Sequence, residues 1–301
     1  MNPRSYPRMN HLGICLVLLA YPGIIKGQDL QEFLEQQTKE TTEITSATFK
    51  ATRIMNGHSI ERMPEGQLDF RISHRFGRVN GGAYEFFGLD QAHIHLSLEY
   101  GIKDWIMAGI GRGTFEKTVD GFFKISPVRQ SSGNKNIPVS ISWMSGGFIN
   151  GLRWSRPERE PLFWQRLSYA HQLMIARKFS PAFSLQLTPS YLHRNFVETV
   201  NDPNDLFALG AGSRIKLTSR ISFNAEYFFL FRPDNETLSQ PLHNPLSLGF
   251  DIETGGHVFQ IILTNSLGMR ENGFLGHTTG RWLNGDIHMG FNISRVFQIK
   301  R

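Results

Sequence analysis

The sequence predicts an all-β fold, a transmembrane antiparallel β-barrel of about 12 strands, and three observations lead to this prediction. Segments of about ten residues alternate between apolar and polar side chains, as strands with one face toward lipid do. Short and long connections alternate between these segments. The sequence has no run of 18 or more apolar residues for a transmembrane helix, whereas a barrel needs apolar residues only at every second position.

The first 27 residues have the composition of a secretory signal peptide. Arg4 and Arg8 precede a short apolar run at residues 12–25, and we expect cleavage near Gly27. Cleavage would remove Cys15, the single cysteine, so the mature chain would hold neither a disulfide nor a thiolate metal site. It would also lower the formal net charge from +6 to +3. Because the sequence shows no basic cluster, we expect no nucleic-acid partner.

Residues 28–66 are expected to form a periplasmic N-terminal segment, and residues 67–301 the barrel. The first part, residues 28–47, is polar and is interpreted either as one short helix or as a solvated tether. Thr48–Ile54 has the composition of a strand, but Asn56–Gly57 and Pro64 interrupt it. We interpret this second part as a lead-in to the barrel or as a plug.

The barrel strands follow in series, and the clearest pair lies in Phe207–Phe231. Phe207 and Leu209 share a face opposite Ala208 and Gly210, and the same alternation resumes after a polar turn at residues 218–220. Strands near Pro127 and Pro138 are weaker, because proline removes a ladder donor. The predicted strands are 67–76, 91–100, 105–115, 119–128, 137–146, 165–177, 183–194, 205–217, 220–231, 246–254, 257–266 and 286–298.

The connections between these strands favour an outer-membrane barrel. Short links at 101–104, 178–182, 218–219 and 255–256 alternate with long ones at 77–90, 147–164, 195–204, 232–245 and 267–285. Outer-membrane barrels have tight periplasmic turns and extended outer loops, and aromatic residues near their strand ends. The last strand, GDIHMGFNISRVFQIKR, resembles the C-terminal strand that bacterial barrel-insertion machinery recognises. We therefore expect two partners, this machinery and outer-membrane lipid.

Several stretches resemble a known family: TFKATRIMNGHSIE, LDFRISHRFGRVNGGAYEFFGLDQA, GIGRGTFEKTVDGF, RLSYAHQLMIARKF and SLGFDIETGGHVFQIILTNSLGM. They are similar to an uncharacterised family of outer-membrane β-barrel proteins of Bacteroidetes, a domain of unknown function named DUF5777. The resemblance covers residues 48–299. It implies a barrel in the bacterial outer membrane and no catalytic residue, and the expected signal peptide would direct export through the inner membrane.

If the apolar faces of the strands contact lipid, a set of charged residues points into the lumen, because charge toward lipid is costly. They would line a water-filled channel as an electrostatic field, or pair with one another into a plug that closes the barrel. Both interpretations stay open at this stage. The predicted lumen-lining residues are Asp69, Arg71, Arg75, His93, His95, Glu99, Glu226, Asp251, Glu253 and His288.

Two clusters in this set could carry chemistry. His93 and His95 share a face with Glu99, and His288 could complete a zinc or copper site, but we interpret them as ordinary polar lumen residues. His95 and Ser97 are spaced like the pair of outer-membrane phospholipase, yet they lie on the polar face without an amide partner. We expect no metal, no cofactor and no catalytic residue.

The sequence therefore predicts a passive, porin-like channel for small polar solutes. The alternative is a closed barrel that serves as a scaffold or anchor for a periplasmic or surface partner, through the outer loops or residues 28–60. A lipid-active enzyme is the third interpretation. Electrical conductance separates the first from the second.

Overall fold

The computed structural model describes residues 41–154 and 162–300. The expected signal peptide and the polar residues 28–40 lie outside these described residues. The chain forms two compact units, and the described part of the first is residues 41–43 and 133–135. Strands β1 (Thr42–Ile44) and β6 (Ser131–Gly133) form a separate two-stranded sheet. No helix in the described part of the chain is long and apolar enough to cross a membrane.

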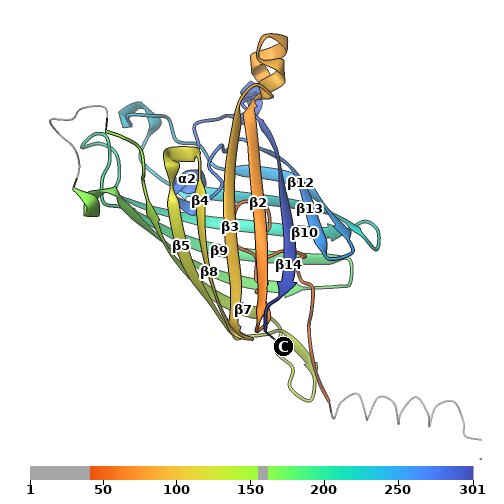
Figure 1. Ribbon diagram of the computed structural model, residues 1–301. Helices are drawn as coiled ribbons and strands as arrows, with labels where there is room; N and C mark the ends of the chain where they lie inside the picture. The colour runs from red at the N-terminus through yellow and green to blue at the C-terminus, as the bar shows by residue number, and fades with distance from the viewer. Residues whose placement is uncertain (1–40, 155–161, 301) are drawn as a thin grey trace, which may run out of the picture. The chain divides into compact units, whose positions relative to one another are not determined.

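The second unit contains a closed antiparallel barrel of 12 strands, which confirms the predicted fold (Figure 1). Neighbours in sequence pair throughout, and the last strand closes the barrel on the first through Phe297 opposite Leu68. The strands are β2 (Gln67–Arg78), β3 (Ala92–Lys103), β4 (Ile106–Gly113), β5 (Val119–Val128), β7 (Ser140–Ile149), β8 (Leu167–Lys178), β9 (Phe183–Arg194), β10 (Asp205–Lys216), β11 (Ile221–Phe231), β12 (Leu246–Thr254), β13 (His257–Thr264) and β14 (His288–Gln298).

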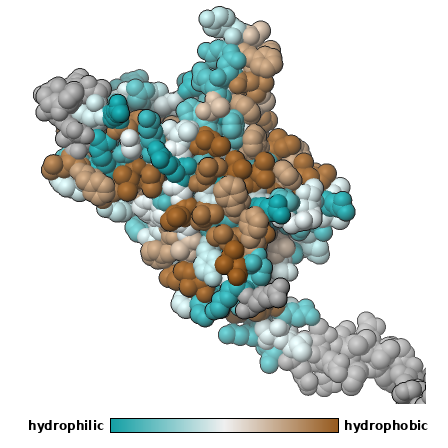
Figure 2. Space-filling model, viewed as in Figure 1, coloured by the Kyte–Doolittle hydropathy of each residue, from teal (hydrophilic) through white to brown (hydrophobic). Residues whose placement is uncertain are grey.

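The alternation of side chains along the strands sets the two faces of the barrel. In β11 every residue at an even position from Ser222 to Leu230 is buried, while Tyr227, Phe229 and Phe231 are exposed. Apolar side chains gather on the outer surface of the strands in Figure 2. The buried face of β2 and β3 is instead polar and charged. The pattern is that of a barrel with lipid outside and polar groups inside.

The connections divide the barrel into a turn end and a loop end. Residues 104–105, 179–182, 217–220 and 255–256 make tight turns at the turn end. The loop end carries the long connections 79–91, 150–166, 195–204, 232–245 and 265–287. Two connections depart from the predicted alternation: residues 114–118 are short at the loop end, and residues 129–139 are long at the turn end. The second adjoins Pro127, where the pairing of β5 with β7 shifts between Ile125 and Val128.

Short helices occupy several of these connections. The connection 265–287 is the longest, and much of it is buried rather than exposed, including all six residues of its helix α2. The helices are η1 (Val79–Gly88), η2 (Phe115–Lys117), η4 (Phe163–Arg166), η5 (Asn235–Thr237), α2 (Glu271–Gly276) and η6 (Trp282–Asn284).

Residues 48–61, here called the inner segment, fill the middle of the lumen. They form no strand, and a bridge between Arg53 and His58 closes a compact turn in which Ile54 donates its N–H to Gly57. All residues from Ala51 to Ile60 are buried. Their hydrogen-bond partners are inward side chains of β2, β3, β5, β9, β11, β12, β13 and β14, strands from around the whole barrel. Of the two interpretations of this segment, the structure favours the plug.

Candidate functional site: the filled lumen and a cavity at the loop end

On β2 and β3, the predicted lumen residues form a charged network with the inner segment. Arg71 Nη2 donates to Asp69 at 3.0 Å and to Thr52 Oγ1 of the inner segment at 2.7 Å. Thr52 in turn donates to the carboxylate of Glu99. These four side chains are fully buried. Because unpaired charges are costly in such a place, the network holds the inner segment against this wall.

The opposite wall is organised by Glu226 of β11. Its carboxylate accepts backbone N–H groups of Met55, Asn56 and Gly57 at 3.1–3.4 Å. Arg75 of β2 approaches the same turn from the other side and donates to Asn56 Oδ1 at 2.7 Å. Because this segment forms no helix or strand, these three backbone N–H groups have no partner in secondary structure. The Glu226 carboxylate supplies their acceptor. Glu226 and Arg75 therefore hold the tip of the inner segment between them.

Lys124 of β5 bonds to both sides of the turn in the inner segment. Its ammonium group donates to the backbone carbonyls of Glu61 at 2.6 Å, Ser59 at 3.2 Å and Thr52 at 3.4 Å. The ammonium group is fully buried and has three donors, one for each carbonyl. Lys124 was not among the lumen-lining residues predicted from the sequence. The signal that could have identified it is its position on the polar face of the predicted strand 119–128, whose alternation is weak.

Helix α2 joins the inner segment to the loop end. Glu271 accepts a hydrogen bond from Arg53 Nη1 at 2.9 Å, and both side chains are buried. The preceding residue, Arg270, donates from Nη2 to His95 Nδ1 at 2.9 Å and to Ser97 Oγ at 3.0 Å. His95 Nε2 donates to Asp120, so both ring nitrogens have partners. These bonds draw the connection 265–287 into the barrel above the inner segment.

The predicted lumen residues are distributed as follows. Asp69, Arg71, Arg75, His95, Glu99, Glu226, Asp251 and His288 are buried on the inner face. His93 is half-buried near the loop end, and the partly exposed Glu253 pairs with Lys50 at 2.6 Å near the turn end. Asp251 accepts a hydrogen bond from Gln260 at 2.9 Å. The residues thus occupy several levels of the lumen and do not converge on one site.

Neither chemical cluster from the sequence forms a recognisable centre. His288 Nδ1 bonds to the Phe76 carbonyl at 2.8 Å, while His95 is engaged by Asp120 and Arg270. Among the described residues, no group of three or more His, Cys, Asp or Glu is placed to hold a metal ion. Ser97 is buried inside the barrel and accepts a hydrogen bond from Arg270, so it does not face lipid.

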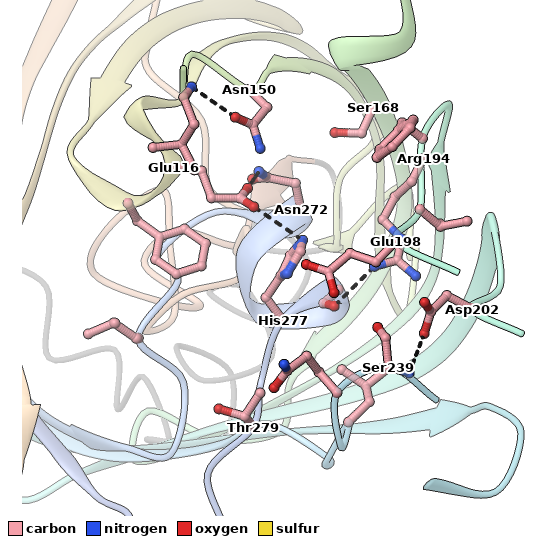
Figure 3. A pocket seen from close by; sticks show the side chains of 18 of the residues that line it. Glu116, Asn150, Ser168, Arg194, Glu198, Asp202, Ser239, Asn272, His277 and Thr279 are labelled. Atoms are coloured by element: carbon pink, nitrogen blue, oxygen red, sulfur yellow. Dashed lines mark hydrogen bonds and ion pairs between the residues drawn. The ribbon is translucent and has the colours of Figure 1, made fainter. Parts of the chain in front are cut away.

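A cavity of about 630 Å³ lies at the loop end, between the long connections (Figure 3). This volume is typical of sites for small organic ligands. The cavity could not be predicted from the sequence, because most of its wall comes from five connections that lack periodicity. Its lining includes Phe115, Glu116, Asn150, Trp154, Gln165, Arg194, Phe196, Asp202, Leu238, Ser239, Leu242, Asn272, His277 and Thr279.

Two of the three acidic groups that line the cavity, Asp202 and Glu116, have partners within its walls. Asp202 accepts hydrogen bonds from Thr199 and from the Ser239 N–H, which ties the connection 195–204 to 232–245. Burial raises the pKa of Asp202, but these hydrogen bonds outweigh it and hold the pKa at about 2. Glu116 lies 3.6 Å from His277 Nε2 of the connection 265–287. Burial lowers the pKa of His277 despite that carboxylate, so the ring is neutral at pH 7.

Solved structures of similar fold include bacterial channels. A structure described as the NanC porin shares 9% identity, with 78% of this chain and 100% of that chain covered and a TM-score of 0.47. The COG4313 outer membrane channel from Pseudomonas putida F1 shares 11% identity, with 79% and 98% covered and a TM-score of 0.49. The translocator domain of the autotransporter NalP from Neisseria meningitidis shares 11%, with 90% and 96% covered and a TM-score of 0.35. The likeness is one of barrel fold.

No curated protein sequence matches the chain. A family model does match, and its match extends over residues 49–297, from the inner segment to the last strand. Its description, a membrane bound beta barrel domain, agrees with the closed barrel described above. The Bacteroidetes origin and the signal peptide stay predictions. The family resemblance found in the sequence is confirmed: the chain belongs to the DUF5777 family of membrane-bound β-barrel domains.

Proposed function

We propose that this protein is a bacterial outer-membrane barrel that passes small polar solutes through a lumen closed at rest by the inner segment. The loop end would face outward and the turn end the periplasm. The observation that supports a closed resting state is the burial of the inner segment among charged strand residues on opposite walls, such as Arg71 and Glu226. This state makes a permanently open pore the weaker interpretation.

The chemistry of the lumen wall supports a pore that opens. A barrel that never opens gains little from buried charges, because well-packed apolar residues replace buried ion pairs at no cost or with a gain in stability. The strand residues beneath the inner segment are nevertheless Asp69, Arg71, Glu99, Lys124 and Glu226. Once the segment moves aside, these groups would face water. Charges of both signs would then line the path of a polar solute.

The second candidate is a permanently closed barrel that anchors a periplasmic or surface partner. It is favoured by the extent of the bonding between the inner segment and the strands, including three carbonyls on Lys124 alone. The lipid-active enzyme considered from the sequence gains no such support, because Ser97 faces the lumen. Recognition by barrel-insertion machinery through β14 stays a prediction.

Conductance of the refolded mature chain in planar bilayers tests the proposal. We expect the wild type to be mostly silent and the Glu226→Ala variant to show discrete openings, because Met55, Asn56 and Gly57 lose their common acceptor. The matched control is Glu236→Ala in the connection 232–245, away from the inner segment, which should stay silent. Heat-modifiable migration on gels establishes that each barrel is folded.

Two results would contradict this proposal in different ways. A wild-type chain with steady conductance would mean that the inner segment does not close the pore. Folded Glu226→Ala barrels that remain silent, even after Arg75→Ala is added, would favour the scaffold. Capture of a partner through the outer loops or residues 28–60 would then be the next experiment.

A further inference from the structure

Arg194, at the loop end of β9, is a cation without a carboxylate partner in the cavity wall. Its guanidinium donates to two backbone carbonyls, from Nη2 to Pro203 at 2.7 Å and from Nη1 to Gly276 at 3.3 Å. Its Nε–H is buried and has no acceptor among the described residues. Arg78, which also lines the cavity, differs in pairing with Asp286 at 3.2 Å.

Three acids line the cavity, Glu116, Glu198 and Asp202, and among the described residues none of them forms an ion pair with Arg194. Asp202 is engaged by Thr199 and Ser239, and Glu116 lies beside His277. Neither makes an ion pair with Arg194, although both attract it at longer range. Carbonyl oxygens carry only partial charge, so the guanidinium keeps most of its charge. Among the described residues, Nη1 and Nη2 each make one of the two hydrogen bonds that they can donate. Figure 3 shows the side chain of Arg194 at the wall of the cavity.

The cavity wall also has an apolar part among its polar lining residues. The rings of Trp154 and Phe196 meet edge to face, with centroids 5.0 Å apart, and Leu238 and Leu242 also line the cavity. Trp154 Nε1 is a second buried donor with no acceptor in the described part of the chain. A concave apolar wall with a few polar groups is the usual form of a site for a small organic molecule.

We propose that this cavity binds a small organic carboxylate with a ring or compact apolar body. The carboxylate accepts from Arg194, and the body packs against Phe196, Trp154 and the leucines. A free inorganic anion would leave the apolar part of the wall in water, and a neutral molecule would leave the Arg194 guanidinium without a counter-charge. The inference goes beyond the proposed function, because binding at the loop end does not require the lumen to open.

Calorimetric titration of the full mature chain in detergent tests this proposal. The probe is 2-naphthoate, and its neutral counterpart is 2-naphthalenemethanol, each corrected for partition into empty micelles. We expect wild-type protein to bind the carboxylate at least about tenfold more tightly than the alcohol, as a charged hydrogen bond to a buried guanidinium implies. Arg194→Gln should remove that preference. Arg232→Gln, the matched control at the same end but outside the cavity lining, should keep it.

Equal affinity of the wild type for the two probes, or no measurable binding of either, would overturn the assignment without use of any variant. The same holds if Arg194→Gln, folded by its gel migration, retains the preference. A preference that Arg232→Gln loses to the same degree would indicate general attraction by positive charge and would also overturn the site. None of these outcomes depends on conductance, so failure here and failure of the proposed pore are distinguishable.

Discussion

The middle of the lumen and the cavity at the loop end are both lined by charged side chains, but they use charge differently. In the lumen, Glu99 and Glu226 meet donors of the inner segment, and both carboxylates are buried. In the cavity, Arg194 and the partly exposed Glu116 face open volume. The contrast teaches that polar residues on the inner side of a barrel do not by themselves indicate a water-filled path. A segment from elsewhere in the chain can satisfy them.

The largest effect should come from removing the hydrogen bond between Glu271 of α2 and Arg53 of the inner segment, which joins the two regions. Glu271→Ala removes the close partner of buried Arg53. Among the described residues, Glu99 at 3.8 Å is then the remaining carboxylate within 4 Å of the guanidinium. Loss of one partner of a buried pair costs about 3 kcal/mol. We expect that decrease in the free energy of unfolding, measured by denaturant titration in detergent, together with more frequent openings in bilayers.

Glu116→Ala is the matched variant on the cavity side. Its carboxylate lies 3.6 Å from His277, and the histidine side chain is 38% exposed. Because the His277 ring is neutral at pH 7 and more than a third of it is open to solvent, this contact contributes less than about 1 kcal/mol. If the two glutamate variants destabilised the barrel equally, the distinction between a bonded lumen and an open cavity would be wrong.

A somewhat smaller effect is expected at Lys124. Lys124→Met keeps the length of the side chain but leaves the carbonyls of Thr52, Ser59 and Glu61 without their shared donor. Because Thr52 O also accepts the Ser59 N–H, we expect a loss of about 2 kcal/mol in the free energy of unfolding.

Lys178→Met supplies the comparison for that variant, since the Lys178 ammonium donates to one carbonyl, Ser46 O, in an exposed position. Its loss should stay below about 0.5 kcal/mol. Denaturant titration of both lysine variants measures the difference. A Lys124→Met barrel as stable as the wild type would show that other contacts hold the two sides of the turn in the inner segment.

The sequence predicted the strands well because each strand carries its own signal. Alternation in Phe207–Phe231 needs no knowledge of distant residues, and β10 and β11 begin and end within one residue of their predicted limits. The weaker prediction at 137–146 was displaced by three residues, since β7 begins at Ser140, beyond Pro138. Alternation also identified the inward direction of Arg71, Glu99 and Glu226.

The contents of the lumen could not be derived in the same way. The inner segment has no periodicity, and the residues that satisfy it, such as Glu226 and Gln260, lie about 170 to 210 positions further along the chain. Pairing of the charged lumen residues with one another was one of two open interpretations. In the structure, charged residues such as Glu226 instead bond to the backbone of a turn, which no sequence pattern identifies. The cavity likewise depends on residues that are far apart in the sequence, such as Arg194 at the end of β9 and Asn272 in the connection 265–287.

The smallest effect is expected at Asp202, whose hydrogen bonds join the connections 195–204 and 232–245 in the cavity wall. Its folded pKa of about 2 lies below the ordinary value of 3.8, so its stabilising contribution is present above about pH 4 and is lost as the pH falls through about 2. Because the side chain is partly exposed, the contribution is roughly a few tenths of a kcal/mol. The protection factor of the Ser239 amide, which compares its exchange rate with that of an unstructured amide at the same pH, should therefore fall between pH 4 and pH 2 in the wild type. Asp202→Asn should abolish this pH dependence, whereas Asp234→Asn should keep it, and an unchanged profile in Asp202→Asn would mean that the connections are held together by other contacts.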